Sequence, residues 1–278
     1  DEVDYDDSWY GDAFYAAGGY TLERINPENL CGLGDNWRAC LAENLGTPGS
    51  VNSIFSNASF SPVPSLVSGQ FSTLKTAELF FDRRMDSASL SSARVTWGQE
   101  TFGVRIIEGD FTKVAIDRQQ EFERGKSYSF LIDSVSDCTG SILMNARIEV
   151  YLHDSGDIVI NELLTNPRGS GTDFVELYNH SAYAVSLKDW SLAYKDTKDS
   201  LRFNPISTHA LSLSPAGYVA LNEDNEDLVF NYPGALNQRL VEMNLPSYAN
   251  DKASVLLYDQ LGTLMDRFEY SEDLQFDL

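Results

Sequence analysis

Basic residues are scarce in this chain, which holds 20 Lys and Arg against 42 Asp and Glu and has a formal net charge of −22. Nucleic acids and anionic membrane surfaces are bound by clustered Lys and Arg, so the composition argues against both as partners. No apolar run reaches the roughly 18 residues of a membrane span, and no charged-then-apolar leader opens the sequence. We therefore expect no membrane insertion within this chain.

Residues that carry chemistry are also few. The three histidines, His153, His180 and His209, are scattered in turn-like sequence without metal-ligand spacing, and we interpret them as surface residues. The chain contains no nucleophile elbow, no phosphate-binding glycine loop and no Cys/His cluster of the kind that holds zinc. We assign no catalytic, cofactor-binding or metal-ligating residue and expect the chain not to be an enzyme.

Only three cysteines are present, and their spacing leaves the disulfide pairing open. Cys31 and Cys40 enclose the short segment "CGLGDNWRAC", which a disulfide could close, stabilising the fold by about 2 to 3 kcal/mol. The alternative is a bond between Cys31 and Cys138, and a third possibility is that all three thiols are free.

Short strands are the dominant pattern of the second half of the chain. Its segments alternate apolar with polar residues and are separated by Gly, Pro, Asn and Asp. Such strands at about ten-residue spacing predict a β-sandwich or barrel. The predicted strands are 157–164, 173–179, 184–194, 217–221, 253–259 and 264–270.

The middle of the chain has the same pattern, with enough strands for one immunoglobulin-like sandwich. Prolines in "NASFSPVPS" (57–65) and the polar segment "HDSGD" (153–157) mark its edges. We therefore divide the chain into residues 1–53, 54–154 and 155–278. The predicted strands of the middle part are 76–82, 92–97, 102–108, 111–117, 126–133 and 146–152.

Three groups of residues could form a ligand site. Glu162 and Glu176, on neighbouring predicted strands, could act as an acid–base pair, but solvated or structurally hydrogen-bonded glutamates are the better interpretation. The acidic segments 1–7 and 222–227 offer oxygen ligands for calcium without the EF-hand spacing. The aromatic residues of "DSWYGDAFYAAGGY" (7–20) could stack on sugars, although core packing is the more common use of such side chains.

The two ends of the chain resemble each other. The segments "DEVDYDDSWYGDA" (1–13) and "DRFEYSEDLQFDL" (266–278) align without a gap, which places Asp1 on Asp266 and Tyr5 on Tyr270. The sequence also does not begin with Met. We expect an excerpt of a longer precursor, in which these segments are the same strand and loop of two successive copies of one domain.

Three short segments follow one another in the second half of the chain: "INELL" (160–164), "DFVELYN" (173–179) and "LKDWSL" (187–192). In this combination the sequence resembles the lamin tail domain, an immunoglobulin-like sandwich also carried by exported bacterial proteins. Residues 18–53 resemble the closing part of the same domain. The resemblance implies that 155–278 is the opening part of a lamin-tail-like domain, which residues 1–53 complete by folding back or by exchange with a second copy.

The middle part resembles the SbsA-type bacterial Ig-like family, first described in surface-layer proteins. "AELFFDRRMDSASL" (77–90) and "YSFLIDSVSDCTG" (128–140) carry this resemblance, although Ser141 stands where that family often has Asn. The combined resemblance implies an all-β chain of Ig-like sandwiches, as in exported proteins of the Bacteroides group. The implied location is the periplasm, the outer membrane or the cell surface.

The implied function is a non-catalytic scaffold, spacer or adhesion and binding module. Alternatives are accessory modules of a larger secreted phosphoesterase or nuclease, and a glycan-binding module. Partners could be a cell-surface protein, a glycan or a second copy. We expect no cofactor, with calcium as the least improbable exception.

Overall fold

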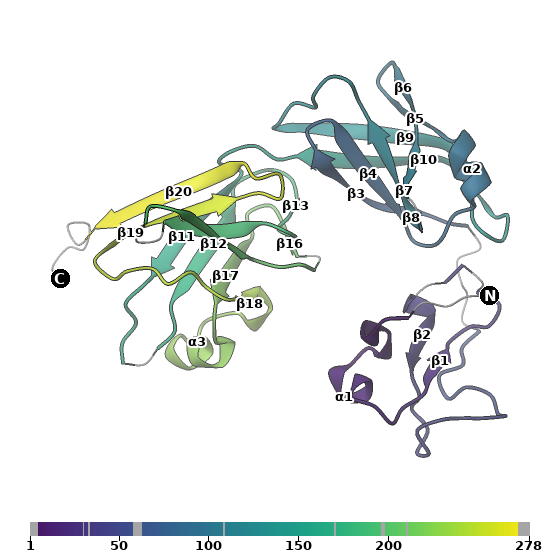
Figure 1. The fold of residues 1–278 in the computed structure, drawn as a ribbon, viewed down its shortest axis with the longest axis horizontal. Coiled ribbons are helices and arrows are strands. Elements are labelled where there is room, and N and C mark those ends of the chain that lie inside the picture. Colours follow the sequence, from purple (N-terminus) through teal and green to yellow (C-terminus); the bar gives the residue numbers. More distant parts are fainter. Residues whose placement is uncertain are drawn as a thin grey trace. The chain divides into compact units, whose positions relative to one another are not determined.

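The computed structural model describes residues 5–29, 31–32, 34–57, 63–107, 109–169, 171–195, 198–209 and 211–271 (Figure 1). The chain divides into two compact units. The first comprises residues 1–71, 75–122 and 127–150, and the second comprises residues 72–74, 123–126 and 151–278. The regular structure of both units is mostly β-strand, which confirms the predicted all-β, Ig-like sandwich class.

Two four-stranded sheets form the sandwich of the first unit, in the orders β3-β4-β8-β7 and β10-β9-β5-β6. Alternate residues of β4 are buried, as expected of a strand with one face in a core. The aromatic rings of Phe71, Phe122, Tyr128 and Phe130 pack in this core. The strands are β3 (Leu66–Thr73), β4 (Thr76–Phe81), β5 (Arg94–Trp97), β6 (Glu100–Gly103), β7 (Arg105–Ile107), β8 (Asp110–Asp117), β9 (Lys126–Ser136) and β10 (Ile142–Leu152), and α2 (Ser87–Ser92) follows β4.

The N-terminal segment, residues 5–57, has little regular structure. Strands β1 (Leu22–Arg24) and β2 (Trp37–Ala39) pair antiparallel, and one short α-helix, α1 (Ala13–Ala16), and the 3-10 helices η1 (Asp7–Tyr10) and η2 (Gly34–Asn36) accompany them. Glu23 is buried, and its carboxylate accepts hydrogen bonds from Thr47 and from the backbone and hydroxyl of Ser53. Burial would raise the pKa of the Glu23 carboxyl, but these hydrogen bonds hold it below its usual range.

The disulfide joins Cys31 to Cys138, and Cys40 is a buried free thiol. The Cys31–Cys40 pairing is therefore wrong, and the alternative pairing is the one formed. Cys138 follows Asp137, whose carboxylate accepts three hydrogen bonds from Thr139 and Ser141 and so builds the turn that presents the cysteine. The bond ties the N-terminal segment to the strand-rich part of the first unit.

The second unit is a sandwich of two four-stranded sheets, in the orders β11-β12-β17-β18 and β15-β14-β19-β20. Its core is formed by apolar residues of both sheets around the fully buried Trp190. The strands are β11 (Ile158–Leu164), β12 (Phe174–Asn179), β14 (Ser191–Lys195), β15 (Leu201–Pro205), β17 (Tyr218–Asn222), β18 (Leu240–Glu242), β19 (Lys252–Tyr258) and β20 (Leu264–Ser271), with a short β13 (Val185–Ser186) and β16 (Ser212–Leu213) pair, α3 (Asn225–Asn231) and the 3-10 helix η3 (Asn237–Arg239).

The strand predictions locate the long strands to within a few residues and fail where a single residue breaks the run. The predicted strand 184–194 is two strands, β13 and β14, because the intervening Asp189 has a φ of 62°. The predicted strand 102–108 is likewise divided between β6 and β7. Strand β3 and the helix α3 were not predicted.

Strands β1 and β2 pair only with each other in the described part of the chain. The sheets of the second unit are formed without any described strand from residues 1–53, so the expected completion of that sandwich within one chain is not seen. Exchange with a second copy stays a prediction, as does the division into three segments. Residues 1–4 and 272–278, which carry much of the repeated phrase, lie outside the described residues.

Helices are too short in the described ranges for any of them to cross a membrane.

Candidate functional site

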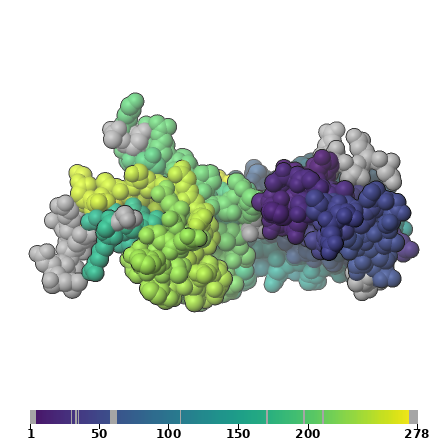
Figure 2. Space-filling model, turned by 90° about the horizontal axis from the view of Figure 1, so that it is seen from below, coloured from purple at the N-terminus to yellow at the C-terminus, as the bar shows by residue number. Residues whose placement is uncertain are grey.

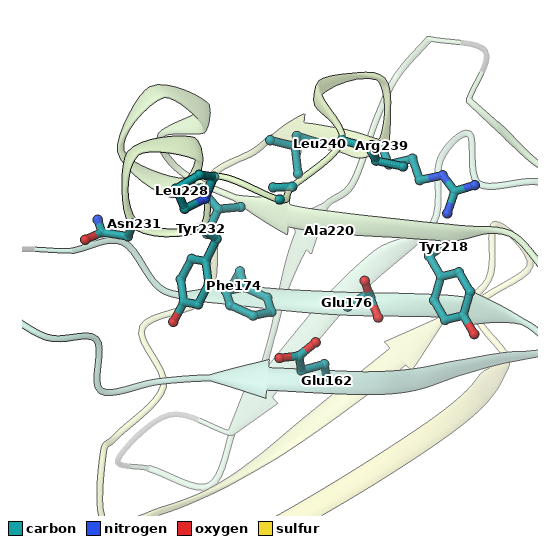
Figure 3. Close-up of a pocket in the computed structure, with 14 residues that line it drawn as sticks. Glu162, Phe174, Glu176, Tyr218, Ala220, Leu228, Asn231, Tyr232, Arg239 and Leu240 are labelled. Atoms are coloured by element: carbon teal, nitrogen blue, oxygen red, sulfur yellow. The ribbon is translucent and has the colours of Figure 1, made fainter.

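A groove of about 690 Å³ lies on the outer face of the sheet β11-β12-β17-β18 (Figure 3). The register places Glu162 directly beside Glu176, Glu176 beside Ala220, and Ala220 beside Leu240, so one row of four residues crosses the sheet. All four line the groove. The other face of the same strands supplies Val175, Leu177, Val219 and Leu221 to the core, which follows from the two-residue period of a strand.

A β-bulge places the polar pair Asn161 and Glu162 in the groove region. The register of β11 against β12 shifts between Ile160 and Glu162, so Asn161 is the extra residue. Its amide Nδ2 donates to Glu176 Oε1 at 2.7 Å and orients that carboxylate. Two consecutive polar residues in an otherwise alternating strand are the sequence signal for this bulge.

The opposite wall is formed by α3 and the segment that follows it. Asp224 caps the helix, because its carboxylate accepts a hydrogen bond from the backbone N–H of Asp227 at 2.9 Å. Leu228 of this helix packs on Phe174 and Ala220 in a small cluster on the outer face of the sheet. In the space-filling view of Figure 2 this part of the chain, coloured yellow-green, lies at the surface of the second unit.

Aromatic rings and one basic residue complete the lining. Phe174 meets Tyr232 edge to face at 5.8 Å between ring centroids, and Tyr218 pairs with Tyr178 at 4.7 Å. Arg239, the one base among the lining residues, comes from η3 and projects toward the Tyr218 side of the groove (Figure 3). The groove therefore offers apolar and aromatic surface with two carboxylates on its floor.

The two glutamates are neighbours across β11 and β12, as predicted. Within the described ranges the carboxylate of Glu162 makes no hydrogen bond or ion pair, and the carboxylate of Glu176 is held only by the neutral amide of Asn161. Side chains directly opposite on adjacent strands have Cβ atoms about 4.5 to 5.5 Å apart, and like charges there are destabilising. The pair can accept hydrogen bonds or hold a cation, and among the residues that the structure describes no third acid joins it to form a metal-binding group.

The described ranges contain no group of three or more His, Cys, Asp or Glu side chains that could hold a metal ion. The acidic segment 222–227 starts a helix: Asn222 is buried and Asp224 is the helix cap. In the other acidic segment, Asp6 caps η1 by accepting from the backbone of Ser8. The expectation of no cofactor, with calcium as the least improbable exception, stays untested.

A buried charge cluster lies elsewhere in the second unit. Asp259 Oδ2 is 2.9 Å from Arg124 Nη2 and 3.1 Å from His153 Nε2. Arg124 also donates to the Thr263 hydroxyl and to the carbonyl of His153. Burial alone would raise the pKa of the Asp259 carboxyl, but the bonds with His153 and with the Thr263 backbone, and the charge of Arg124, hold it below its usual range. These satisfied groups stabilise the fold.

Two interpretations of the sequence are corrected by burial. His153 is only 5% exposed, so it is a core histidine, whereas His180 and His209 are exposed as expected. Among the N-terminal aromatics, Phe14 is 67% exposed and packs with Tyr15 and Tyr20 at the surface, where a core position was expected. These rings form a cluster at the surface.

Comparisons with known proteins identify the second unit. No curated protein matches the chain. The N-terminal part of the bacterial S-layer protein SbsC is similar with a TM-score of 0.30 and 11% identity over 58% of this chain and 43% of that chain. A DUF4876 family protein from Bacteroides thetaiotaomicron has a TM-score of 0.27 and 12% identity over 60% of this chain and 62% of that chain. The chain thus covers less than two thirds of either structure.

Residues 152–272 match the family described as Lamin Tail Domain. The match begins at Leu152, the last residue of β10, and runs through β20, so it includes both sheets of the second unit and the groove described above. It confirms the resemblance read from the words around Glu162, Glu176 and Trp190. Residues 152–272 of this chain are therefore a lamin tail domain.

Proposed function

We propose that this chain is a non-catalytic, exported β-protein that serves as a modular scaffold or spacer, and that the groove of its lamin tail domain is a binding surface. The observation that carries the proposal is the combination of an open groove, apolar and aromatic lining, and two carboxylates at its floor. Ligand sites are typically concave and apolar with a few placed polar groups.

Export is supported by the disulfide between Cys31 and Cys138, because such bonds persist in oxidising compartments. The proposed location is the periplasm, the outer membrane or the cell surface, and the proposed partners are surface proteins or glycans and not nucleic acid. The net charge of −22 disfavours a phosphate backbone.

Binding is tested by blocking the groove. Ala235→Trp places a large ring in the lining loop, and Ala182→Trp makes the same change at an exposed position away from the groove. The purified chain is applied to arrays of defined peptides and glycans. We expect specific signals that Ala235→Trp abolishes and Ala182→Trp keeps. No signal, or signals that both variants keep, would overturn the binding role.

The rival function is hydrolysis by the glutamate pair, and it makes a different prediction. A catalytic pair would hydrolyse bis-p-nitrophenyl phosphate or p-nitrophenyl glycosides, and Glu162→Gln or Glu176→Gln would abolish the turnover. We expect no turnover above that of these variants. Hydrolysis that either substitution removes would refute the non-catalytic assignment.

A further inference from the structure

The charge at the groove floor is not compensated by the chain itself. Glu162 and Glu176 are paired directly across β11 and β12, and neither makes an ion pair in the described ranges. Arg239 lines the same groove yet makes no ion pair with them. A protein that only needed a stable sheet could place neutral residues here, because like charges directly opposite destabilise a strand pair.

The part of the chain that forms the groove has a net negative charge, the same sign as the two glutamates. Residues 155–278 hold nineteen acids and eight bases, a formal charge of −11. A negative field of this kind raises the association rate of cationic partners and does not change the association rate of a neutral partner. Charge complementarity therefore favours a positively charged ligand over a neutral glycan.

The side chains that line the walls of the groove indicate which kind of positively charged group would fit. Phe174, Tyr218 and Tyr232 present aromatic surface, and Ala220, Leu236 and Leu240 present aliphatic surface close to the carboxylates. An arginine side chain has an apolar stem, a planar cation that stacks on aromatic rings, and several N–H donors that can reach two carboxylates at once. A small hydrated metal ion would use only the two glutamates and would leave these walls without a role.

We propose that this groove binds a basic peptide segment of a partner protein, with an arginine side chain placed between Glu162 and Glu176 and apolar neighbours covering Ala220 and Leu240. The inference rests on the proposed role of the groove as a binding surface and names its ligand. Arg239 then tunes the affinity, because its charge opposes the incoming cation.

The test uses the peptide acetyl-Leu-Arg-Leu-amide and its citrulline analogue, which keeps the shape and removes the charge. Each is titrated into the isotope-labelled chain, and the amide resonances of β11, β12 and β17 are followed. We expect saturable shifts with the arginine peptide and binding about tenfold weaker or worse with citrulline. Raising the NaCl concentration from about 50 to about 500 mM should weaken the arginine complex, because salt screens exposed charges.

Matched variants localise the effect. Glu162→Gln combined with Glu176→Gln should lower the affinity by about tenfold or more, whereas Glu269→Gln, which removes an exposed charge from the same unit, should leave it nearly unchanged. Arg239→Gln should raise the affinity severalfold. The spectra also report whether each variant is folded.

The outcomes separate this inference from the function on which it rests. Equal binding of both peptides, no binding of either, or binding that the double glutamate variant keeps would overturn the inference. A neutral oligosaccharide that shifts the same resonances, with no response to the arginine peptide, would also overturn it while the binding role of the groove stands. Loss of affinity on Arg239→Gln would count against a cationic ligand.

Discussion

The Cys31–Cys138 disulfide should carry most of the stability of the N-terminal segment. Among the described residues from 5 to 57, the buried apolar side chains are only Cys31, Ala39 and Cys40. A segment with so small a core needs a cross-link to stay folded. We predict that Cys31→Ser combined with Cys138→Ser releases this segment and leaves the sandwich of β3 to β10 folded.

The stabilisation that the disulfide contributes can be worked out from the entropy of closing the loop between the two cysteines. The cysteines are 107 residues apart, and closing a loop of that length contributes about 4.7 kcal/mol when the whole unit unfolds. If the sandwich stays folded, the relevant loop runs from Cys31 to the start of β3 at Leu66, roughly 35 residues, and contributes about 3.8 kcal/mol in the same chain-entropy relation. The predicted loss of protection is therefore almost three orders of magnitude, since about 1.36 kcal/mol is a factor of ten.

Hydrogen exchange measured by mass spectrometry tests this prediction. Peptides that cover β1 and β2 should lose protection in the double serine variant, while peptides that cover β4 and β8 keep theirs. Cys40→Ser serves as the control, because it changes the free thiol and leaves the disulfide intact. A change of less than about tenfold in β1 and β2 would refute the loop-closure reasoning.

Three further predictions concern the second unit and the association of chains. Asp259→Ala leaves the largely buried Arg124 without its carboxylate partner and should lower the free energy of unfolding in urea by about 3 kcal/mol. Asp199→Ala, in an exposed pair, should barely move the urea midpoint, and equal midpoints for the two variants would contradict the structural role of the cluster. Because the pKa of Asp259 is lowered in the folded state, its stabilising effect is complete above its unfolded pKa of about 4 and is lost as the pH falls through the folded value. Melting temperatures from pH 5 to about 2.5 should thus fall faster for the unmodified chain than for Asp259→Asn, and parallel curves would exclude the linkage. Exchange of residues 1–53 with a second copy predicts oligomers whose fraction rises with concentration in analytical ultracentrifugation, and a monomer throughout would contradict it.

The sequence predicts what depends on local periodicity. Alternation of apolar and polar residues located β4 and β12, in which every second residue is buried along most of the strand. It could not show where a single backbone angle ends a strand, as at Asp189. The pairing of the disulfide could not be predicted from local sequence either, because Cys31 and Cys138 meet only through the tertiary fold.

The groove was predictable in part. The strand order places Glu162 beside Glu176 once the bulge at Asn161 is allowed for. The wall was missed because the acidic segment "NEDNED" (222–227) was considered as a source of oxygen ligands for calcium and not as the start of a helix. The signal was present, since Asp224 precedes Asp227 by three residues and Leu228 follows at the start of an apolar face, which is typical of a helix N-terminus.

The disulfide also determines how this chain responds to tension. A pulling force that enters before Cys31 passes through the covalent bond to Cys138 and does not load the chain between them, which spans a sequence separation of 107. Fully extended, that stretch would add roughly 350 to 385 Å of length. While the bond is intact, the strands from β3 to β9 are thus shielded from the load, which is carried instead by β10 and by the lamin tail domain, because both lie beyond Cys138.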